Sequence, residues 1–431
     1  MPEFLTLLPP DAARDLLFTH LPRTAIESES IDVSRSLGRV LAEDIIAPQP
    51  LPDFQRTTVD GYAVRAGDTF GASDSLPAYL TLIGEVPMGD APAFELSEGQ
   101  CALIHTGGML PTGADAVVML EYTQHIVEAG SSRPGYGRED TAHTEIEIFR
   151  AVAHGENVIR VGEDVAQGQL VLPKGTLIRP AEIGGLLALG ITSVHVARKI
   201  QVGLISTGDE VIDPSHQPRP GQVRDINSYT LAALVEKSGG LAKRYGIFSD
   251  QFEALKDAAA KALSESDVVV ITAGSSASTR DMTADVIRSL GAPGVLVHGI
   301  NTRPGKPTIL GVCNGKALIG LPGNPVSALV NGYLFVVPLI ENLLGEMPKP
   351  KATILARLNV NLPSQAGRED WWPVKLTPSP IGRGQGESVS AEPIFGKSNL
   401  IFTLAAADGL LRIHADATGV SAGEMVEVML I

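Results

Sequence analysis

Four consecutive β-branched residues at positions 268–271 (VVVI) constrain the fold of this chain more than any other feature. An apolar run without polar alternation is typical of a strand that is buried on both faces of a parallel sheet. A loop of small and hydroxylated residues follows, and then a segment that has helical character through Leu290. A strand, such a loop and a helix N-terminus can together present backbone N–H groups to an anion. The stretch is therefore either an anion-binding loop or an ordinary structural turn, and its candidate ligand residues are Gly274, Ser275, Ser276, Arg280 and Asp281.

Strands and helices alternate from residue 200 onward, which predicts a mostly parallel sheet. Asn314-Gly315 predicts a hairpin turn, and Asn324-Pro325 marks the start of a further helix. Upstream, the spacing of apolar residues predicts helices over 7–21, 34–44 and 180–189. Short strand-like segments with Gly turns predict a small β-rich module over 53–149, containing a surface loop at 129–143, and a small β-barrel after residue 348.

Composition argues against several classes of function. The 431-residue chain has a formal net charge of −15, whereas a general nucleic-acid binder needs a basic surface that neutralises phosphates. Its two cysteines are too few for a disulfide framework, so we expect buried thiols and a cytoplasmic protein. The N-terminus has acidic residues and prolines where a signal peptide is basic and then apolar. Polar residues interrupt the apolar stretch 328–344, which predicts a buried helix and no membrane span.

Charged side chains in the predicted loops suit two kinds of ligand. Asp209 and Asp281 could hold a hard cation such as Mg²⁺, which binds one or two carboxylates together with substrate phosphate oxygens. Arg303 and Lys306, held between prolines, could bind an oxyanion. Ser327 lies near a helix start and could donate to the same anion. For each acid the alternative is a helix cap or a turn residue.

Long motifs through almost the whole chain resemble those of the molybdopterin molybdenumtransferase (molybdenum insertase) family, which includes the gephyrin E domain. They occur in the family's order, which makes the resemblance specific. The motifs are VDGYAVR (59–65), HTGGMLPTGADAVVMLE (105–121), GENVIRVGEDV (155–165), ISTGDE (205–210), PGQVRDINSY (220–229), RPGKP (303–307), GLPGNPVSA (320–328) and GKSNLIFTLAAADGLLRI (396–413).

The resemblance implies a multidomain α/β-plus-β fold in a homodimer. Four parts are expected in each subunit: a discontinuous elongated domain (1–48 and 150–185), a β-rich domain (49–149), an α/β molybdopterin-binding domain with a mostly parallel sheet (186–346) and a C-terminal β-barrel (347–431). The implied activity is a step of molybdenum cofactor biosynthesis. Molybdenum from molybdate is inserted into adenylylated molybdopterin and AMP is released, with Mg²⁺ or another divalent cation assisting.

Site residues are carried over from the family position by position. The resemblance implies that the adenylylated phosphate and its metal are bound by Asp209, Ser276 and Asp281. It implies that molybdate is bound by Arg303, Lys306, Ser327, Arg368 and Ser398. The turn formed by Pro322, Gly323 and Asn324 is also expected to bind substrate. Functionally important family positions are matched by Asp60, Thr106, Asp164 and Glu182, which in the dimer would approach the α/β domain of the other subunit.

Two positions of the 273–283 loop depart from the family pattern, in which Ala273 and Ser278 are usually glycine. Either the loop takes another conformation, or hydroxyl groups of Ser275 and Ser278 replace backbone contacts to the ligand.

Three other functions are compatible with parts of the pattern: a tungstate-specific insertase, a molybdopterin-binding scaffold protein and a molybdopterin adenylyltransferase. The adenylyltransferase family has a single α/β domain, which the three additional domains expected here argue against. Expected partners are a molybdopterin adenylyltransferase and the enzymes that receive the cofactor.

Overall fold

The computed structural model describes residues 7–22, 27–127, 144–273, 277–378 and 389–431. The predicted loop 129–143 therefore falls outside the described residues. The chain forms two compact units. Unit 1 comprises Met1–Glu43, Lys174–Arg179 and Ser193–Ile431, and unit 2 comprises Asp44–Pro173 and Pro180–Thr192.

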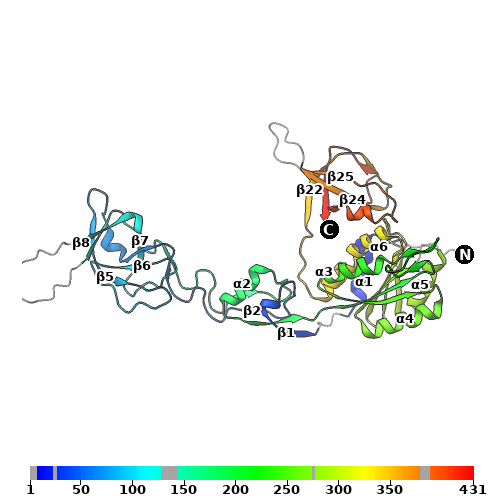
Figure 1. Ribbon diagram of the computed structural model, residues 1–431, viewed down its shortest axis with the longest axis horizontal. Helices are drawn as coiled ribbons and strands as arrows, with labels where there is room; N and C mark the ends of the chain where they lie inside the picture. Colours follow the sequence, from blue (N-terminus) through cyan, green and yellow to red (C-terminus); the bar gives the residue numbers. More distant parts are fainter. Residues whose placement is uncertain (1–6, 23–26, 128–143, 274–276, 379–388) are drawn as a thin grey trace, which may run out of the picture. The chain divides into compact units, whose positions relative to one another are not determined.

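A six-stranded sheet forms the centre of unit 1 within the described residues (Figure 1). Its strands, in spatial order, are β16 (Leu241–Phe248), β13 (Gln201–Thr207), β17 (Val268–Ala273), β21 (Lys316–Pro322), β20 (Ile309–Cys313) and β18 (Pro293–His298). The first four strands pair in parallel with one another, and the pairs β21–β20 and β20–β18 are antiparallel. The predicted mostly parallel sheet is confirmed.

The β-branched run lies in β17, which is buried over its whole length. Val268 and Val270 belong to the hydrophobic core on one face of the sheet, and Val269 and Ile271 belong to the core on the other face. Because successive side chains of a strand point to opposite faces, a strand between two cores must be apolar at every position. This is the physical reason for the uninterrupted VVVI run.

Helices cover both faces of this sheet. One core contains residues of α1 (Pro10–His20), α3 (Asn227–Lys237), α6 (Pro325–Asn331) and α7 (Val337–Leu343). The other contains residues of α4 (Phe252–Glu265) and α5 (Ala277–Ser289) (Figure 1).

The free thiols Cys101, in unit 2, and Cys313, at the end of β20, are buried, as predicted. Burial raises the pKa of Cys101 to about 12 and that of Cys313 to about 11.

Two local predictions in this region are confirmed. Asn314 and Gly315 have φ angles of 53° and 78°, as expected for a primed turn, and they join the antiparallel strands β20 and β21. After Asn324, α6 continues through a π-helical turn, η4 (Gly332–Val336), into α7. The stretch Pro325–Leu343 is apolar and long enough to cross a membrane, but 67% of an 18-residue window within it is buried in the fold, as in a core helix.

A closed barrel follows in the C-terminal part of unit 1, as predicted. Among the described residues it has five strands, joined into a ring by pairing of the first with the last. In ring order they are β24 (Glu369–Pro378), β25 (Val389–Pro393), β22 (Thr353–Leu358), β28 (Met425–Leu430) and β26 (Gly409–Ile413). A short strand from the α/β region, β19 (Thr302–Arg303), pairs with β24 in parallel and places Arg303 opposite Asp370. The loop that contains β19 is thereby attached to the barrel.

Unit 2 contains a second six-stranded sheet in its described part. The strands, in spatial order, are β7 (Ala116–Met119), β4 (Gly61–Val64), β6 (Gln100–Ile104), β5 (Ala78–Glu85), β9 (Thr144–Ile148) and β8 (Thr123–Val127). The predicted β-rich character is confirmed. Helix α2 (Pro180–Ala188) begins at a proline and is followed by Gly190 with φ 76°, in agreement with the helix predicted over 180–189.

The helix predicted over 34–44 is wrong. A single 3₁₀ turn, η1 (Val33–Arg35), is followed by Gly38 at φ 73°, and Val40 and Leu41 form β-bridges to Leu177 and Val196. The helical spacing of apolar residues was misleading, because this segment pairs through its backbone with residues more than 130 positions away. Such long-range pairing overrides local periodicity.

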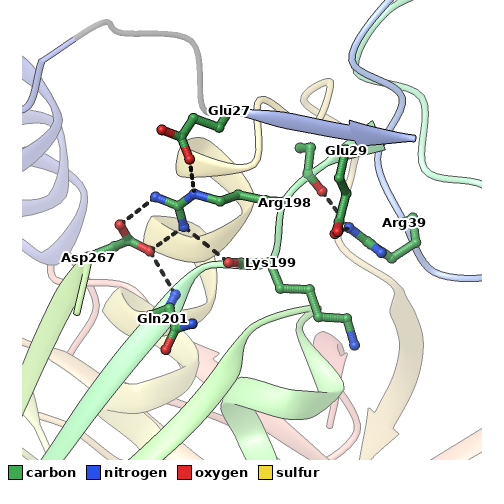
Figure 2. Close-up of polar contacts among 8 residues, drawn as sticks. Glu27, Glu29, Arg39, Arg198, Lys199, Gln201 and Asp267 are labelled. Carbon is green, nitrogen blue, oxygen red and sulfur yellow. Dashed lines mark hydrogen bonds and ion pairs between the residues drawn. The ribbon is translucent and has the colours of Figure 1, made fainter. Parts of the chain in front are cut away.

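An ion pair joins Arg198, just before strand β13, to Asp267, just before strand β17 (Figure 2). The Arg198 guanidinium donates from Nη1 and Nη2 to the two Asp267 oxygens at 2.7 and 2.8 Å, and its Nε lies 3.4 Å from Glu27. Asp267, which immediately precedes β17, also accepts from the Gln201 amide at 2.8 Å. These bonds fix the starts of β13 and β17 relative to each other.

Candidate functional site

The carboxyl ends of β13, β17 and β21 border a cavity of about 590 Å³. In open α/β sheets, ligands bind at this end of the strands. The wall of the cavity contains polar residues of the strand ends, of the first turn of α3 and of nearby loops: Ser206, Thr207, Glu210, Asp225, Asn227, Thr272, Gly323 and Asn324. The predicted site residues Gly323 and Asn324 are therefore part of this wall.

Asp225 lies in this wall and was not predicted, although it belongs to the PGQVRDINSY motif. It is buried and accepts hydrogen bonds from Ser206 Oγ at 2.8 Å, from Ser228 Oγ at 2.6 Å and from the Ser228 amide at 3.1 Å. Three donors satisfy this buried carboxyl group and hold it at the cavity wall. From the sequence alone, a single acid within a motif cannot be recognised as a buried carboxyl group at a cavity wall, because an acid in an ordinary turn looks the same.

The predicted metal site is only partly described. Asp209 is exposed at the end of β13, and its Oδ1 accepts from the Asp250 amide at 3.3 Å. The backbones of Arg280 and Asp281 lie in the first turns of α5, but their side chains fall outside the described part, as do Gly274, Ser275 and Ser276 entirely. Among the residues described, no group of three or more His, Cys, Asp or Glu side chains could hold a metal ion. The exposed Asp209 carboxylate lies between two residues of the cavity wall, Thr207 and Glu210, and fits a cation that takes its other ligands from substrate and water.

A second cavity, of about 490 Å³, lies where loop 302–307 meets the barrel. Its lining brings together all five residues expected to bind molybdate: Arg303, Lys306, Ser327, Arg368 and Ser398. Lys397 adds a further cation, and Ser327 is almost fully buried. Guanidinium, ammonium and hydroxyl donors in the wall of one cavity, beside tryptophan and proline side chains, suit the binding of an oxyanion.

Asn324 borders both cavities, so the two are neighbours. Its Nδ2 donates to Ser398 Oγ at 3.1 Å, and the Val326 amide donates to the Ser398 carbonyl at 3.0 Å. On the other side, Asn227 Nδ2 donates to the Gly323 carbonyl at 2.8 Å. The predicted turn 322–324 thus forms the partition between the two cavities.

Two residues of the second cavity region were missed by sequence reasoning. Asp370 forms ion pairs with Arg303 and Arg368, and the Trp372 ring lies under the Arg303 guanidinium. The available signal was the stretch REDWW at 368–372, which contains both tryptophans of the chain directly after a predicted ligand.

The predicted residues of unit 2 are brought together only in part. Asp60 Oδ1 accepts from the Thr106 amide at 2.7 Å and from Thr106 Oγ1 at 3.1 Å. These hydrogen bonds lower the pKa of Asp60. Asp164 is exposed in the turn between β10 (Val158–Ile159) and β11 (Leu170–Leu172), whereas Glu182 is buried in the first turn of α2.

The two departures from the family glycines fall in regular structure. Ala273 is the last residue of β17 and pairs with Pro322, and Ser278 lies within α5. Strand and helix backbones accommodate residues such as alanine and serine without the conformational freedom of glycine. Ala273 and Ser278 therefore impose no backbone strain.

Comparison with known proteins agrees with this architecture. The "MoeA N-terminal region (domain I and II)" matches residues 8–190, the "Probable molybdopterin binding domain" matches 203–342, and the "MoeA C-terminal region (domain IV)" matches 355–431. The molybdopterin molybdenumtransferase of Bacillus subtilis is 33% identical over 406 residues, which cover 94% of this chain and 90% of the relative.

Two crystal structures of the molybdopterin biosynthesis MoeA protein from Pyrococcus horikoshii are similar over nearly the full length. One is 33% identical with a TM-score of 0.81, covering 99% of this chain and 100% of the other. The second is 38% identical with a TM-score of 0.76, covering 99% of each chain. This chain therefore belongs to the MoeA family, the molybdopterin molybdenumtransferases.

Proposed function

We propose that this protein inserts molybdenum from molybdate into adenylylated molybdopterin and releases AMP. Its family makes it a transferase of molybdenum cofactor biosynthesis. The observation that carries the proposal is the convergence of Arg303, Lys306, Ser327, Arg368 and Ser398 on one cavity. These residues come from four separated stretches of the chain, and a purely structural role for each would not require a common cavity.

The two cavities suggest a division of labour. In this proposal the adenylylated phosphate occupies the cavity at the strand ends, and molybdate occupies the cavity beside the barrel. Because Asn324 borders both, the metal oxyanion and the dithiolene of the bound pterin would be held side by side. Such placement replaces an encounter between two dissolved reactants and accelerates the reaction through proximity.

Asp209 and Asp281 are the proposed ligands of a divalent cation, with Mg²⁺ as the expected ion. When bound, the cation would neutralise charge on the phosphate as AMP leaves. The residues of the second cavity have a separate role, because their hydroxyl groups and cations bind and orient the oxyanion.

Turnover by the purified full-length protein tests the proposal. Adenylylated molybdopterin and Mg²⁺ are incubated with molybdate or with tungstate, and AMP release and metal incorporation are measured. AMP release that depends on molybdate supports the proposal. Turnover with tungstate alone would assign a tungstate-specific insertase, and tight pterin binding without turnover on either oxyanion would assign a scaffold protein.

We also propose that the protein is a cytoplasmic homodimer with the four-part domain division given above, and that its acids Asp60, Asp164 and Glu182, with Thr106, serve the reaction. Light scattering of the full-length protein tests the subunit number, since a homodimer has twice the 45.3 kDa mass of the chain. Proposed partners are a molybdopterin adenylyltransferase and the enzymes that receive the cofactor, and their capture by the purified protein tests them.

A further inference from the structure

Asp370 occupies an unusual position for an acid, because its side chain has no exposed surface. It is the second residue of β24, and the parallel pairing of β24 with β19 places it directly opposite Arg303. On its other side, Asp370 lies opposite Ile413 of β26. A carboxylate enclosed in this way requires cationic or hydrogen-bonding partners.

Both partners of Asp370 are arginines that line the oxyanion cavity. Nη2 of Arg303 lies 2.8 Å from Oδ2, and Nε of Arg368 donates to Oδ1 at 2.8 Å, with a longer bond from its Nη2 to Oδ2 at 3.4 Å. The Asp370 side chain is fully enclosed, whereas those of Arg303 and Arg368 are 45% and 26% exposed. The carboxylate therefore lies behind the two cations.

The Arg303 guanidinium is also supported from a second direction. Its central carbon lies 5.0 Å from the ring centroid of Trp372, and Phe395 packs edge-to-face against the same ring at 5.7 Å. A guanidinium held by a carboxylate and an aromatic face loses much of its rotational freedom before any ligand arrives. An anion then binds without first having to order the side chain.

From this arrangement we propose that Asp370 is the positioning residue of the oxyanion site, which fixes Arg303 and Arg368 in one relative geometry and thereby sets affinity and selectivity for a tetrahedral dianion. The inference rests on the proposed function. Without Asp370, two like charges that share a small cavity repel each other and move toward solvent. With it, their planar donor groups stay at fixed angles, and selectivity among oxyanions depends on such fixed donors.

The competing role for Asp370 is to fasten β19 to the barrel, and the neighbouring residue provides a matched control. Glu369 also lies in β24, is also buried and is also paired in register with β19. Its ion-pair partner is Arg412, which stacks over Trp371 and also contacts Asp11 at 3.2 Å. Glu369→Gln therefore disturbs the same strand pairing and leaves both arginines of the cavity in their ion pairs with Asp370.

The experiment compares Asp370→Asn and Glu369→Gln in the full-length protein. Asp370→Asn should raise KM for molybdate about ten-fold or more, because the prior ordering of the binding groups is lost. The kcat at saturating molybdate should change by less than about two-fold. It should also weaken the discrimination between molybdate and sulfate as a competitor. KM for adenylylated molybdopterin should stay unchanged, and Glu369→Gln should keep the wild-type KM for molybdate.

An unchanged KM for molybdate in Asp370→Asn, or an equal rise in both variants, would overturn the proposal. If Asp370→Asn does not fold, Trp372→Leu decides, because it keeps both ion pairs and removes the aromatic face under Arg303. That variant should raise KM for molybdate about three-fold, and a wild-type KM there would count against the proposal. If the wild type shows no AMP release, the proposed function fails. The role of Asp370 is then decided by calorimetry, which measures the dissociation constant of molybdate for the same variants.

Discussion

Gly305 faces Asn331 so closely that a Cβ built on Gly305 would overlap the side-chain nitrogen of Asn331. That Asn331 nitrogen donates to the Ser327 carbonyl at 2.8 Å and to the Pro304 carbonyl at 3.2 Å. Asn331 therefore ties the loop of Arg303 and Lys306 to the helix of Ser327. The close approach of Gly305 is a condition for this arrangement.

Gly305→Ala should consequently damage oxyanion binding. The new methyl group must displace either Asn331 or the loop, so we expect KM for molybdate to rise about ten-fold or more. Gly246→Ala is the matched control, because Gly246 has φ 109° against 105° for Gly305 and nothing lies within 4 Å of its added Cβ. Both variants should lose about 1–2 kcal/mol of folding free energy from the left-handed backbone. Steady-state kinetics should separate them, and equal KM values would contradict the close-approach argument.

Removing both arginines of the oxyanion cavity should destabilise the protein more than the sum of the single changes. Arg303→Ala and Arg368→Ala each leave Asp370 one cation, whereas the double variant leaves a fully buried carboxylate unpaired. Loss of the partner of a buried charge costs about 3–5 kcal/mol.

Urea denaturation of the two single variants and the double variant measures this coupling. The same set in an Asp370→Asn background is the control, and there the two changes should be nearly additive. Additive free energies in the native background would show that Asp370 does not link the arginines.

Asp267→Asn should weaken the fold in a manner that depends on pH. Burial opposes ionisation of Asp267, but the hydrogen bonds from Arg198 and the Gln201 amide prevail and lower its pKa below the ordinary value of 3.8. A folded-state pKa below the unfolded one means that the stabilisation is fully present above pH 4 and is lost as the pH falls through the folded pKa. At pH 7 we expect a loss of about 2 kcal/mol.

Chemical denaturation at pH 7 and near pH 3 tests the Asp267 prediction, since the gap between wild type and variant should shrink on acidification. Asp285→Asn is the control, because Asp285 forms an exposed pair with Arg288 one helical turn away. Exposed pairs of this kind contribute about 0–1 kcal/mol. A gap that is as large at pH 3 as at pH 7 would exclude the ionised carboxylate as its cause.

The pKa of Asp60 should depend on the hydroxyl group of Thr106. The Thr106 amide and hydroxyl both donate to Asp60 and hold the pKa of its carboxyl group below the ordinary value. Thr106→Val removes the hydroxyl and keeps the amide, so the pKa should rise part of the way back. Thr106→Ser keeps both donors and should leave it unchanged. A carboxyl-carbon NMR titration measures all three proteins, and equal pKa values for the valine and serine variants would refute the hydroxyl contribution.

Much of the fold could be predicted from local sequence because its causes are local. The VVVI run, the Asn314-Gly315 turn and the Asn324-Pro325 helix start each depend on residues within a few positions, and each is found in the structure. The segment 34–44 could not be predicted in this way. Its conformation depends on partners near residues 177 and 196, and a helical spacing of Leu37, Val40 and Leu41 says nothing about them.

The residues of the second cavity could likewise be predicted only in part. Charged and hydroxylated residues carried over from the family position by position, from Arg303 to Ser398, all lie in its lining. Asp370 and Trp372 could not be recognised, because their roles depend on the register of β19 against β24, which joins residues 67 positions apart. In the sequence alone, an acid next to two tryptophans indicates a strand of the barrel and no part of a binding site.

Anomalous diffraction at the molybdenum edge, from crystals of the full-length protein soaked in molybdate, tests the central claim most directly. A strong peak should lie in the cavity formed by Arg303, Lys306, Ser327, Arg368 and Ser398, and the peak should weaken in the Lys306→Ala variant. A molybdenum peak elsewhere on the protein, with none between these five residues, would contradict the assignment of this cavity to molybdate.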